Sequence, residues 1–112
     1  MKIYHNPRCS KSREGLQILN DSHMNFEIVD YLKTPPTLTE LQEIIKLLGC
    51  KPIDLVRKNE AIWKESFKGK DLSDDAVLKA MADFPKLIER PIVINNGQAV
   101  VGRPPQIIKT IL

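Results

Sequence analysis

The pattern of apolar and polar residues predicts a β-α-β unit at the start of the chain. Ile3-Tyr4 is a short apolar run, and the turn residues Asn6-Pro7 end it. Residues 10–20 follow a helical pattern with Leu16 and Leu19 on the inner side, and residues 26–31 alternate as in a strand. Two parallel strands joined by a helix form a β-α-β unit.

The middle of the chain is predicted to be helical. The sequence Thr34-Pro35-Pro36 breaks the preceding strand, and Thr37 and Glu40 then fit a capping box, in which each side chain bonds a free backbone amide. The helix that follows stops at Gly49. Its apolar face is expected to consist of Leu38, Leu41, Ile44, Ile45 and Leu48.

Three further helical segments are expected before the chain returns to strands. Two short ones cover residues 54–58 and 60–64. Ser73 caps the third, which ends before Pro85. Its expected inward side chains are Val77, Leu78, Met81 and Phe84. Trp63 and Phe67 are interpreted as core residues of this helical block.

The last part of the chain predicts a hairpin and a final helix. Asn96-Gly97 lies between the apolar runs Pro91-Ile92-Val93-Ile94 and Ala99-Val100-Val101, which is the strongest short-range hairpin signal. Pro104-Pro105 opens a helix expected to bury Ile107, Ile108, Ile111 and Leu112. The order β-α-β, helices, β-β-α fits a thioredoxin-like mixed sheet. We therefore expect one domain, residues 1–112, with a helical insertion at about 37–84 between the second and third strands.

Composition narrows the function classes. The chain has 112 residues and a net charge of +3, with its basic residues spread along the sequence, so a nucleic-acid partner is not expected. No apolar run approaches the roughly 20 residues of a spanning helix, so no membrane association is expected. The first residues lack the pattern of a secretory signal, which favours a cytoplasmic location. No helix shows a second apolar face, so a monomer is expected.

The two cysteines, Cys9 and Cys50, are too few and too far apart for a disulfide scaffold. With His5 and His23 they form no recognisable set of zinc ligands, so no metal is expected. Cys50 follows Gly49 at a helix end and is interpreted as a small packing residue. A redox role for Cys50 is the less favoured alternative.

Cys9 is the candidate nucleophile. It lies between the first strand and the first helix, where unpaired backbone amides and the positive end of the helix dipole stabilise a thiolate. Arg8, Lys11 and Arg13 add positive charge, and cysteines in such places can have a pKa of about 3.5–7.5. The same amides can bind a tetrahedral oxyanion. The alternative is a small cysteine packed under the sheet.

These residues resemble a known family. The segment Tyr4-His5-Asn6-Pro7-x-Cys9-x-x-Ser12-Arg13 is similar to the active-site loop of the glutaredoxin-dependent arsenate reductases. Three later segments resemble that family in the same order: Leu55-Val56-Arg57-Lys58-Asn59, Arg90-Pro91-Ile92-Val93-Ile94 and Gly102-Arg103-Pro104. Pro35-Pro36 also matches, so the resemblance extends from Ile3 almost to the last residue.

The resemblance implies a thioredoxin-like fold and a role for each site residue. The Cys9 thiolate attacks the arsenic of arsenate, while Arg57, Arg90 and Arg103 hold the oxyanion with their guanidinium groups. Glutathione attacks the resulting adduct as a co-substrate, glutaredoxin resolves the mixed species, and arsenite leaves; no bound cofactor is implied. Serine at position 12 offers no local resolving thiol, which agrees with an external reductant.

Two supporting residues and the arginines have simpler interpretations as well. His5 could tune the Cys9 thiolate or shuttle a proton, or be a hydrogen-bonded structural histidine. Ser12 could bond the Cys9 sulfur or only cap helix amides. Arg57 alone could be a solvated surface charge. Arg90 and Arg103 each precede proline, which favours an extended backbone. Whether Pro91 is cis stays open at this point.

Two other functions remain as alternatives. One is a glutathione-dependent thiol-disulfide oxidoreductase of the same fold, but exchange between disulfides needs no clamp of three arginines. The other is a non-enzymatic regulator that binds RNA polymerase, since relatives of this fold sense oxidation through a Cys-x-x-Cys pair. Here Ser12 stands three residues after Cys9, so that switch is missing.

Overall fold

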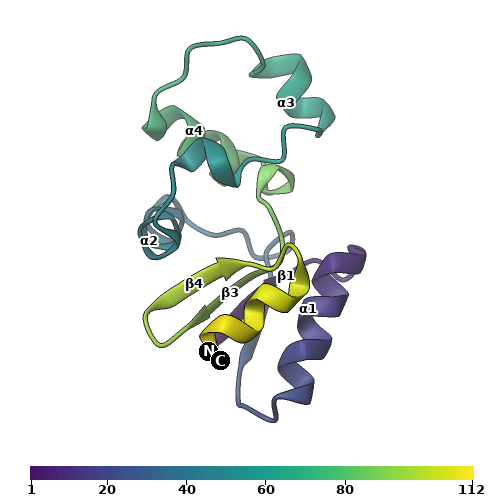
Figure 1. Ribbon diagram of the computed structural model, residues 1–112. Coiled ribbons are helices and arrows are strands. Elements are labelled where there is room, and N and C mark those ends of the chain that lie inside the picture. Colours follow the sequence, from purple (N-terminus) through teal and green to yellow (C-terminus); the bar gives the residue numbers. More distant parts are fainter. The chain divides into compact units, whose positions relative to one another are not determined.

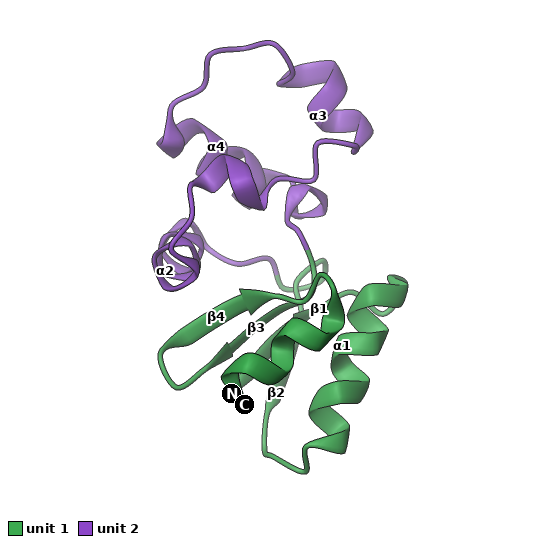
Figure 2. Cartoon of the chain, viewed as in Figure 1, with its two compact units in different colours: residues 1–34, 90–112 green, residues 35–89 purple.

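The computed structural model describes residues 1–112. The chain divides into two compact units (Figure 2). Unit 1 combines Met1–Thr34 with Arg90–Leu112, and unit 2 is Pro35–Glu89. The predicted helical insertion at 37–84 lies within unit 2, so the first and last parts of the chain build one unit together.

Unit 1 contains a four-stranded mixed sheet with two helices packed against it (Figure 1). Its elements are β1 (Lys2–His5), α1 (Ser10–Asp21), β2 (Glu27–Asp30), β3 (Ile92–Asn95), β4 (Gln98–Val101) and the 3-10 helix η3 (Pro105–Ile111). The strand order is β2-β1-β3-β4, with β1 parallel to β2, and β3 antiparallel to both β1 and β4. The predicted thioredoxin-like mixed sheet is confirmed.

The hairpin between β3 and β4 turns at Asn96 and Gly97. Both residues have positive φ, 51° and 72°, as a two-residue turn between twisted strands requires. The predicted hairpin is therefore correct. At the other end of β3, the Arg90–Pro91 peptide bond is cis, as is the Arg103–Pro104 bond that follows β4.

The core of unit 1 lies between the sheet and the helices α1 and η3. Its buried members are Ile3, Leu19, Val93, Ile108 and Ile111. The prediction for the last helix is wrong for Ile107 and Leu112, which are each 39% exposed. The helix is of the 3-10 type, in which residues three apart share a face. Pro105, Ile108 and Ile111 therefore point inward, and Ile107 points away.

Unit 2 is helical. Its elements are α2 (Leu38–Leu48), η1 (Pro52–Leu55), α3 (Ala61–Ser66), α4 (Asp74–Asp83) and η2 (Pro85–Leu87). The predicted capping box of α2 is present, since the Glu40 amide donates to Thr37 Oγ1 and the Thr37 amide donates to Glu40 Oε1. Gly49 ends α2 with a φ of 67°, and Ser73 caps α4 by accepting from the Ala76 amide.

Two side chains predicted to point inward in unit 2 are exposed. Leu38 is the first residue of α2 and is 44% exposed, because its side chain points back beyond the packed turns. Phe84 follows the last helical residue of α4 and is 40% exposed, because its backbone has left the helical conformation. Its ring instead meets Phe67, which stacks on the buried Trp63.

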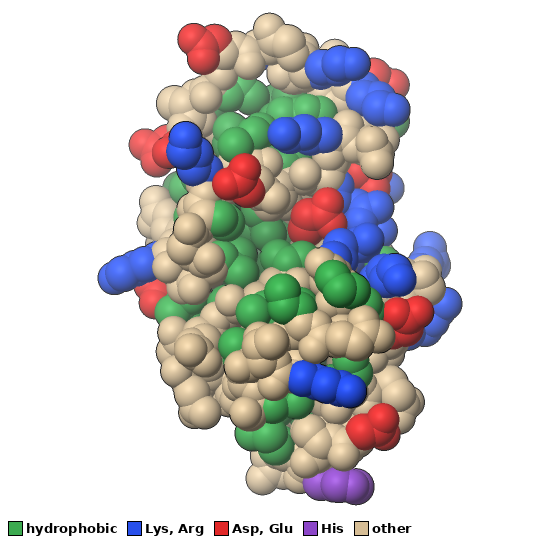
Figure 3. Space-filling view, viewed as in Figure 1, with side chains coloured by type: hydrophobic (Ala, Val, Ile, Leu, Met, Phe, Trp, Pro, Cys, Tyr) green, Lys and Arg blue, Asp and Glu red, His purple; other side chains and the backbone are tan.

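The first short helix of unit 2 also differs from the prediction. Residues 54–58 were expected to be helical, but η1 covers Pro52–Leu55, and Val56 forms an isolated antiparallel bridge with Ile88. None of the helices is long and apolar enough to cross a membrane. On the face shown in Figure 3, basic and acidic side chains are interspersed.

Candidate active site

Cys9 lies where the sequence predicted, at the start of the first helix of unit 1. It is the N-cap residue of α1 and has an extended backbone, with φ −97° and ψ 124°. The turn that leads from β1 into α1 is closed by the Cys9 amide, which donates to the Asn6 carbonyl at 3.0 Å. The Cys9 carbonyl accepts from the Arg13 amide at 3.0 Å and so begins the helix.

The surroundings of Cys9 lower the pKa of its thiol. Burial raises this pKa, but a hydrogen bond from the Arg90 side chain and backbone hydrogen bonds from Ser12 and Lys11 outweigh that effect. All three stabilise the thiolate over the thiol, by hydrogen bonding to the charged form. Cys9 is half-buried, so a reagent or substrate can reach the sulfur.

Two of the three predicted arginines converge on this sulfur. Arg103 Nη2 lies 3.5 Å from Cys9 Sγ, and its Nε donates to the Arg90 carbonyl at 2.8 Å. The Arg90 side chain bonds Cys9 as well. Both arginines belong to unit 1, from the segments before β3 and after β4. The thiolate therefore faces two guanidinium groups together with the amides of the first helical turn.

Tyr31 is a site residue that the sequence did not single out. It follows β2, its side chain is only 1% exposed, and it is hydrogen-bonded to the Arg90 side chain. Burial lowers the pKa of Arg90, but the bonds and charges of Cys9 and Tyr31 raise it overall. Arg90 Nε is buried without a hydrogen-bond partner, which leaves a donor of this guanidinium unused. The only sequence signal for Tyr31 was its place as the last residue of the predicted strand at 26–31.

His5 and Ser12 form a buried pair beneath the loop. His5 Nδ1 lies 2.6 Å from Ser12 Oγ, which also accepts from the Asn6 amide at 2.9 Å. Burial lowers the pKa of His5, against the opposing charge of Asp30, and so favours the neutral imidazole. The Ser12 hydroxyl is hydrogen-bonded to His5 and to the Asn6 amide. The bond from Ser12 to the Cys9 sulfur comes instead from its backbone amide.

The third predicted arginine, Arg57, lies in unit 2. Its amide donates to the Leu87 carbonyl at 2.7 Å. Its guanidinium pairs with two carboxylates, with Nε 3.4 Å from Glu60 and Nη1 3.8 Å from Glu89. The side chain is 21% exposed, so Arg57 is not the freely solvated charge of the simpler interpretation. Its contact with the oxyanion stays a prediction.

Cys50 also belongs to unit 2. Burial, together with the charge of Asp54, raises the pKa of its thiol. A thiol held in its neutral form is a poor nucleophile, in contrast to Cys9. This environment agrees with the interpretation of Cys50 as a packing residue.

A mixed sheet of this topology, with a cysteine of lowered pKa at the start of the first helix, defines a thioredoxin-like protein. Within that class, residues 4–111 match the ArsC family, and the chain belongs to this family.

Named relatives agree with this assignment. The arsenate reductase of Neisseria meningitidis serogroup A is 46% identical over 114 residues, which cover 100% of this chain and 97% of that protein. The uncharacterized protein YfgD of Escherichia coli K12 is 47% identical over 108 residues, or 95% of this chain and 91% of that one. The solved structure of the arsenate reductase from Vibrio cholerae superimposes with a TM-score of 0.94 at 46% identity, covering 100% and 98% of the two chains.

Proposed function

We propose that this protein is an arsenate reductase in which Cys9 is the nucleophile. The observation that carries the proposal is the convergence of Arg90 and Arg103 on the Cys9 sulfur, at the amide-rich start of α1. An anion drawn to these donors is held next to a thiolate, and guanidinium groups suit a tetrahedral oxyanion because they donate in pairs. The names of the similar proteins from Neisseria and Vibrio support the same substrate.

In the first step the Cys9 thiolate displaces one oxygen of arsenate. The sulfur–arsenic bond forms, the oxygen takes up a proton and leaves as water, and arsenic stays in the +5 state. Arg90 and Arg103 neutralise the charge on the remaining oxygens, and we propose Arg57 as a third ligand on the strength of the family resemblance. Preorganised donors of this kind act where charge develops in the transition state.

The second step reduces arsenic, and we propose glutathione as the reductant. Its thiolate attacks the Cys9 sulfur, and the electron pair of the sulfur–arsenic bond passes to arsenic, which leaves as arsenite. Cys9 is then in a mixed disulfide with glutathione, and a glutaredoxin thiolate attacks the glutathione sulfur to free Cys9. The buried Ser12 stands where a neighbouring resolving cysteine would otherwise be, which supports an external thiol. We further propose that the protein works as a monomer in the cytoplasm, in contact with the glutathione pool.

The test is an assay of the purified protein with arsenate, glutathione and glutaredoxin, coupled to NADPH through glutathione reductase. We expect arsenate-dependent NADPH oxidation that is lost in Cys9→Ser and kept in Cys50→Ser. Replacing the glutathione system with thioredoxin and thioredoxin reductase tests the source of electrons.

Each outcome of this assay has a clear meaning. Turnover with thioredoxin alone would contradict the glutathione step, while still supporting arsenate as substrate. A reduced Cys9 that gives no arsenate turnover with either system would contradict the reductase. In that case, turnover of a glutathione mixed disulfide would favour the thiol-disulfide oxidoreductase instead.

A further inference from the structure

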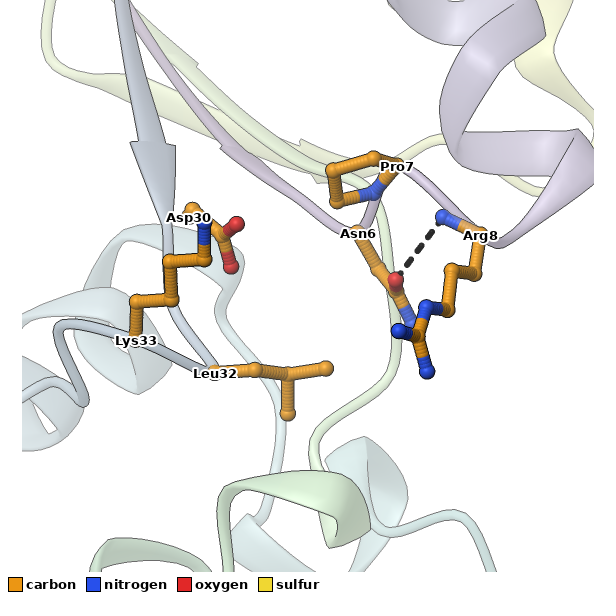
Figure 4. A pocket seen from close by; sticks show the side chains of 6 residues that line it. All are labelled: Asn6, Pro7, Arg8, Asp30, Leu32 and Lys33. Carbon is orange, nitrogen blue, oxygen red and sulfur yellow. Dashed lines mark hydrogen bonds between the residues drawn. The ribbon is translucent and has the colours of Figure 1, made fainter.

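A pocket of about 410 Å³ lies beside the Cys9 loop, within unit 1. Its lining comes from the loop after β1 and from the segment at the end of β2: Asn6, Pro7, Arg8, Asp30, Leu32 and Lys33. Figure 4 shows Asn6 and Arg8 on one side, Asp30 and Lys33 on the other, and Leu32 between them. This volume is in the range of pockets that hold small molecules.

The pocket presents charges of both signs that no neighbouring side chain pairs. Arg8 and Lys33 are cationic and Asp30 is anionic, and none of the three forms an ion pair with another side chain. Leu32 adds an apolar surface and is 38% exposed. An arrangement of two cations, one carboxylate and one apolar side chain fits a ligand with carboxylates, an ammonium group and a short aliphatic stretch.

The loop that forms one wall of this pocket also leads to the nucleophile. Arg8 directly precedes Cys9, so their Cα atoms are about 3.8 Å apart. The loop is held in shape by two hydrogen bonds, from the Arg8 amide to Asn6 Oδ1 and from the Cys9 amide to the Asn6 carbonyl, each 3.0 Å long. Cys9 does not itself line the pocket, but a ligand bound against Arg8 lies beside the loop that carries Cys9.

We infer that this pocket binds the glutathione molecule that attacks the Cys9 adduct. Arg8 and Lys33 bind its two carboxylates, Asp30 binds its ammonium group, and Leu32 contacts the methylenes of its γ-glutamyl residue. The inference rests on the proposed function for the identity of the thiol. Binding in the pocket can be tested apart from that function, because Cys9, Arg90 and Arg103 are not among its lining residues.

Direct binding tests the pocket without any turnover. The probe is S-methylglutathione, which keeps all three charges but has no free thiol, and binding is followed by calorimetry and by amide NMR shifts. We expect shifts at residues 6–8 and 30–33, and an affinity reduced roughly tenfold in Lys33→Ala, since a hydrogen bond to a charged group is lost. Lys109→Ala is the matched control, because Lys109 is also exposed but does not line the pocket.

A second ligand assigns the charges. The ammonium and the α-carboxylate of the γ-glutamyl residue share one carbon, so with the ammonium at Asp30 this carboxylate is bound by Lys33 on the same side of the pocket, and Arg8 binds the glycyl carboxylate (Figure 4). Esterifying the glycyl carboxylate of S-methylglutathione should therefore weaken binding to the wild type and cost little further affinity in Arg8→Ala. Equal losses in both proteins would overturn Arg8 as the partner of that carboxylate, and no binding of S-methylglutathione at millimolar concentration would overturn the pocket.

Kinetics separate this inference from the proposed function. In Lys33→Ala we expect the KM for glutathione to rise about tenfold while the KM for arsenate stays unchanged. Arsenate turnover with an unchanged KM for glutathione would overturn the pocket and leave the reductase standing. Binding of S-methylglutathione that depends on Lys33, in a protein without arsenate turnover, would support the pocket and overturn the reductase.

Discussion

Replacing Gly102 with alanine tests how closely the two arginine segments are packed. A Cβ atom at Gly102 would lie 2.9 Å from both Ile108 Cδ1 and Pro91 Cγ. Carbon atoms in contact normally stand about 3.5–4.0 Å apart, so the new methyl group overlaps both neighbours. The Gly102 amide also donates to the Pro91 carbonyl at 2.8 Å, which fixes the backbone on which the methyl group would be placed.

The expected cost follows from these two overlaps. Adding a methyl group to a well-packed core destabilises by about 1–3 kcal/mol. Ile108 is fully buried, and its Cδ1 is the atom that an Ile108→Val substitution removes. That substitution alone should cost about 0.5–1.5 kcal/mol. In the Gly102→Ala background the same substitution should cost less, because one of the two overlaps disappears.

Urea unfolding of the wild type, both single variants and the double variant measures this coupling. We expect the double variant to lose about 0.5 kcal/mol less stability than the sum of the two single losses. Gly102 packs against Pro91 and directly precedes Arg103, whose guanidinium group contacts the Cys9 sulfur. Alanine at position 102 should therefore also slow the alkylation of Cys9 by iodoacetamide. Strict additivity of the two substitutions would show that the methyl group finds room without displacing Ile108, and so would refute the packing argument.

Three other outcomes are expected. Arg90→Gln should slow alkylation of Cys9 about tenfold at a pH below the pKa of its thiol, since a hydrogen bond to a charged group is worth about 1.5 kcal/mol; an unchanged rate would contradict this role. The pKa of His5 is lower in the folded protein than in the unfolded chain, so the unfolded chain binds a proton more readily as the pH falls through 6.5. The stability of the wild type should therefore decrease over this pH range. His5→Gln should lose less over the same range in urea unfolding at pH 7.5 and 5. Thr37→Ala should cost about 1 kcal/mol by removing the cap of α2, and a change within error would show that the cap contributes nothing.

The features that the sequence predicted correctly are those with local signals. The capping box of Thr37, the Asn96-Gly97 turn and the place of Cys9 each depend on residues within a few positions of one another. Hairpin turns and helix starts need particular backbone angles and amide partners, and only a few residue types supply them. The mixed sheet followed from the order of these elements.

The features that were missed depend on contacts between distant segments or on small differences in helical period. Tyr31 reaches Arg90 only because β1 and β3 are neighbours in the sheet, which no local pattern records. Ile107 was misplaced because seven residues are too few to distinguish a period of 3.0 from 3.6. The pairing of Arg57 with Glu60, in contrast, has the three-residue spacing of a local ion pair and was open to prediction.

The division of unit 1 between the two ends of the chain has a consequence for biosynthesis. Cys9 is made early, but Arg103, whose guanidinium touches its sulfur, is separated from it by 94 positions. Arg90 begins the second segment of unit 1, so it is also made late, just before strand β3. Until the segments that carry Arg90 and Arg103 are made and have joined unit 1, Cys9 lacks both guanidinium groups. The full set of contacts that lower the pKa of its thiol is therefore complete only when unit 1 is complete.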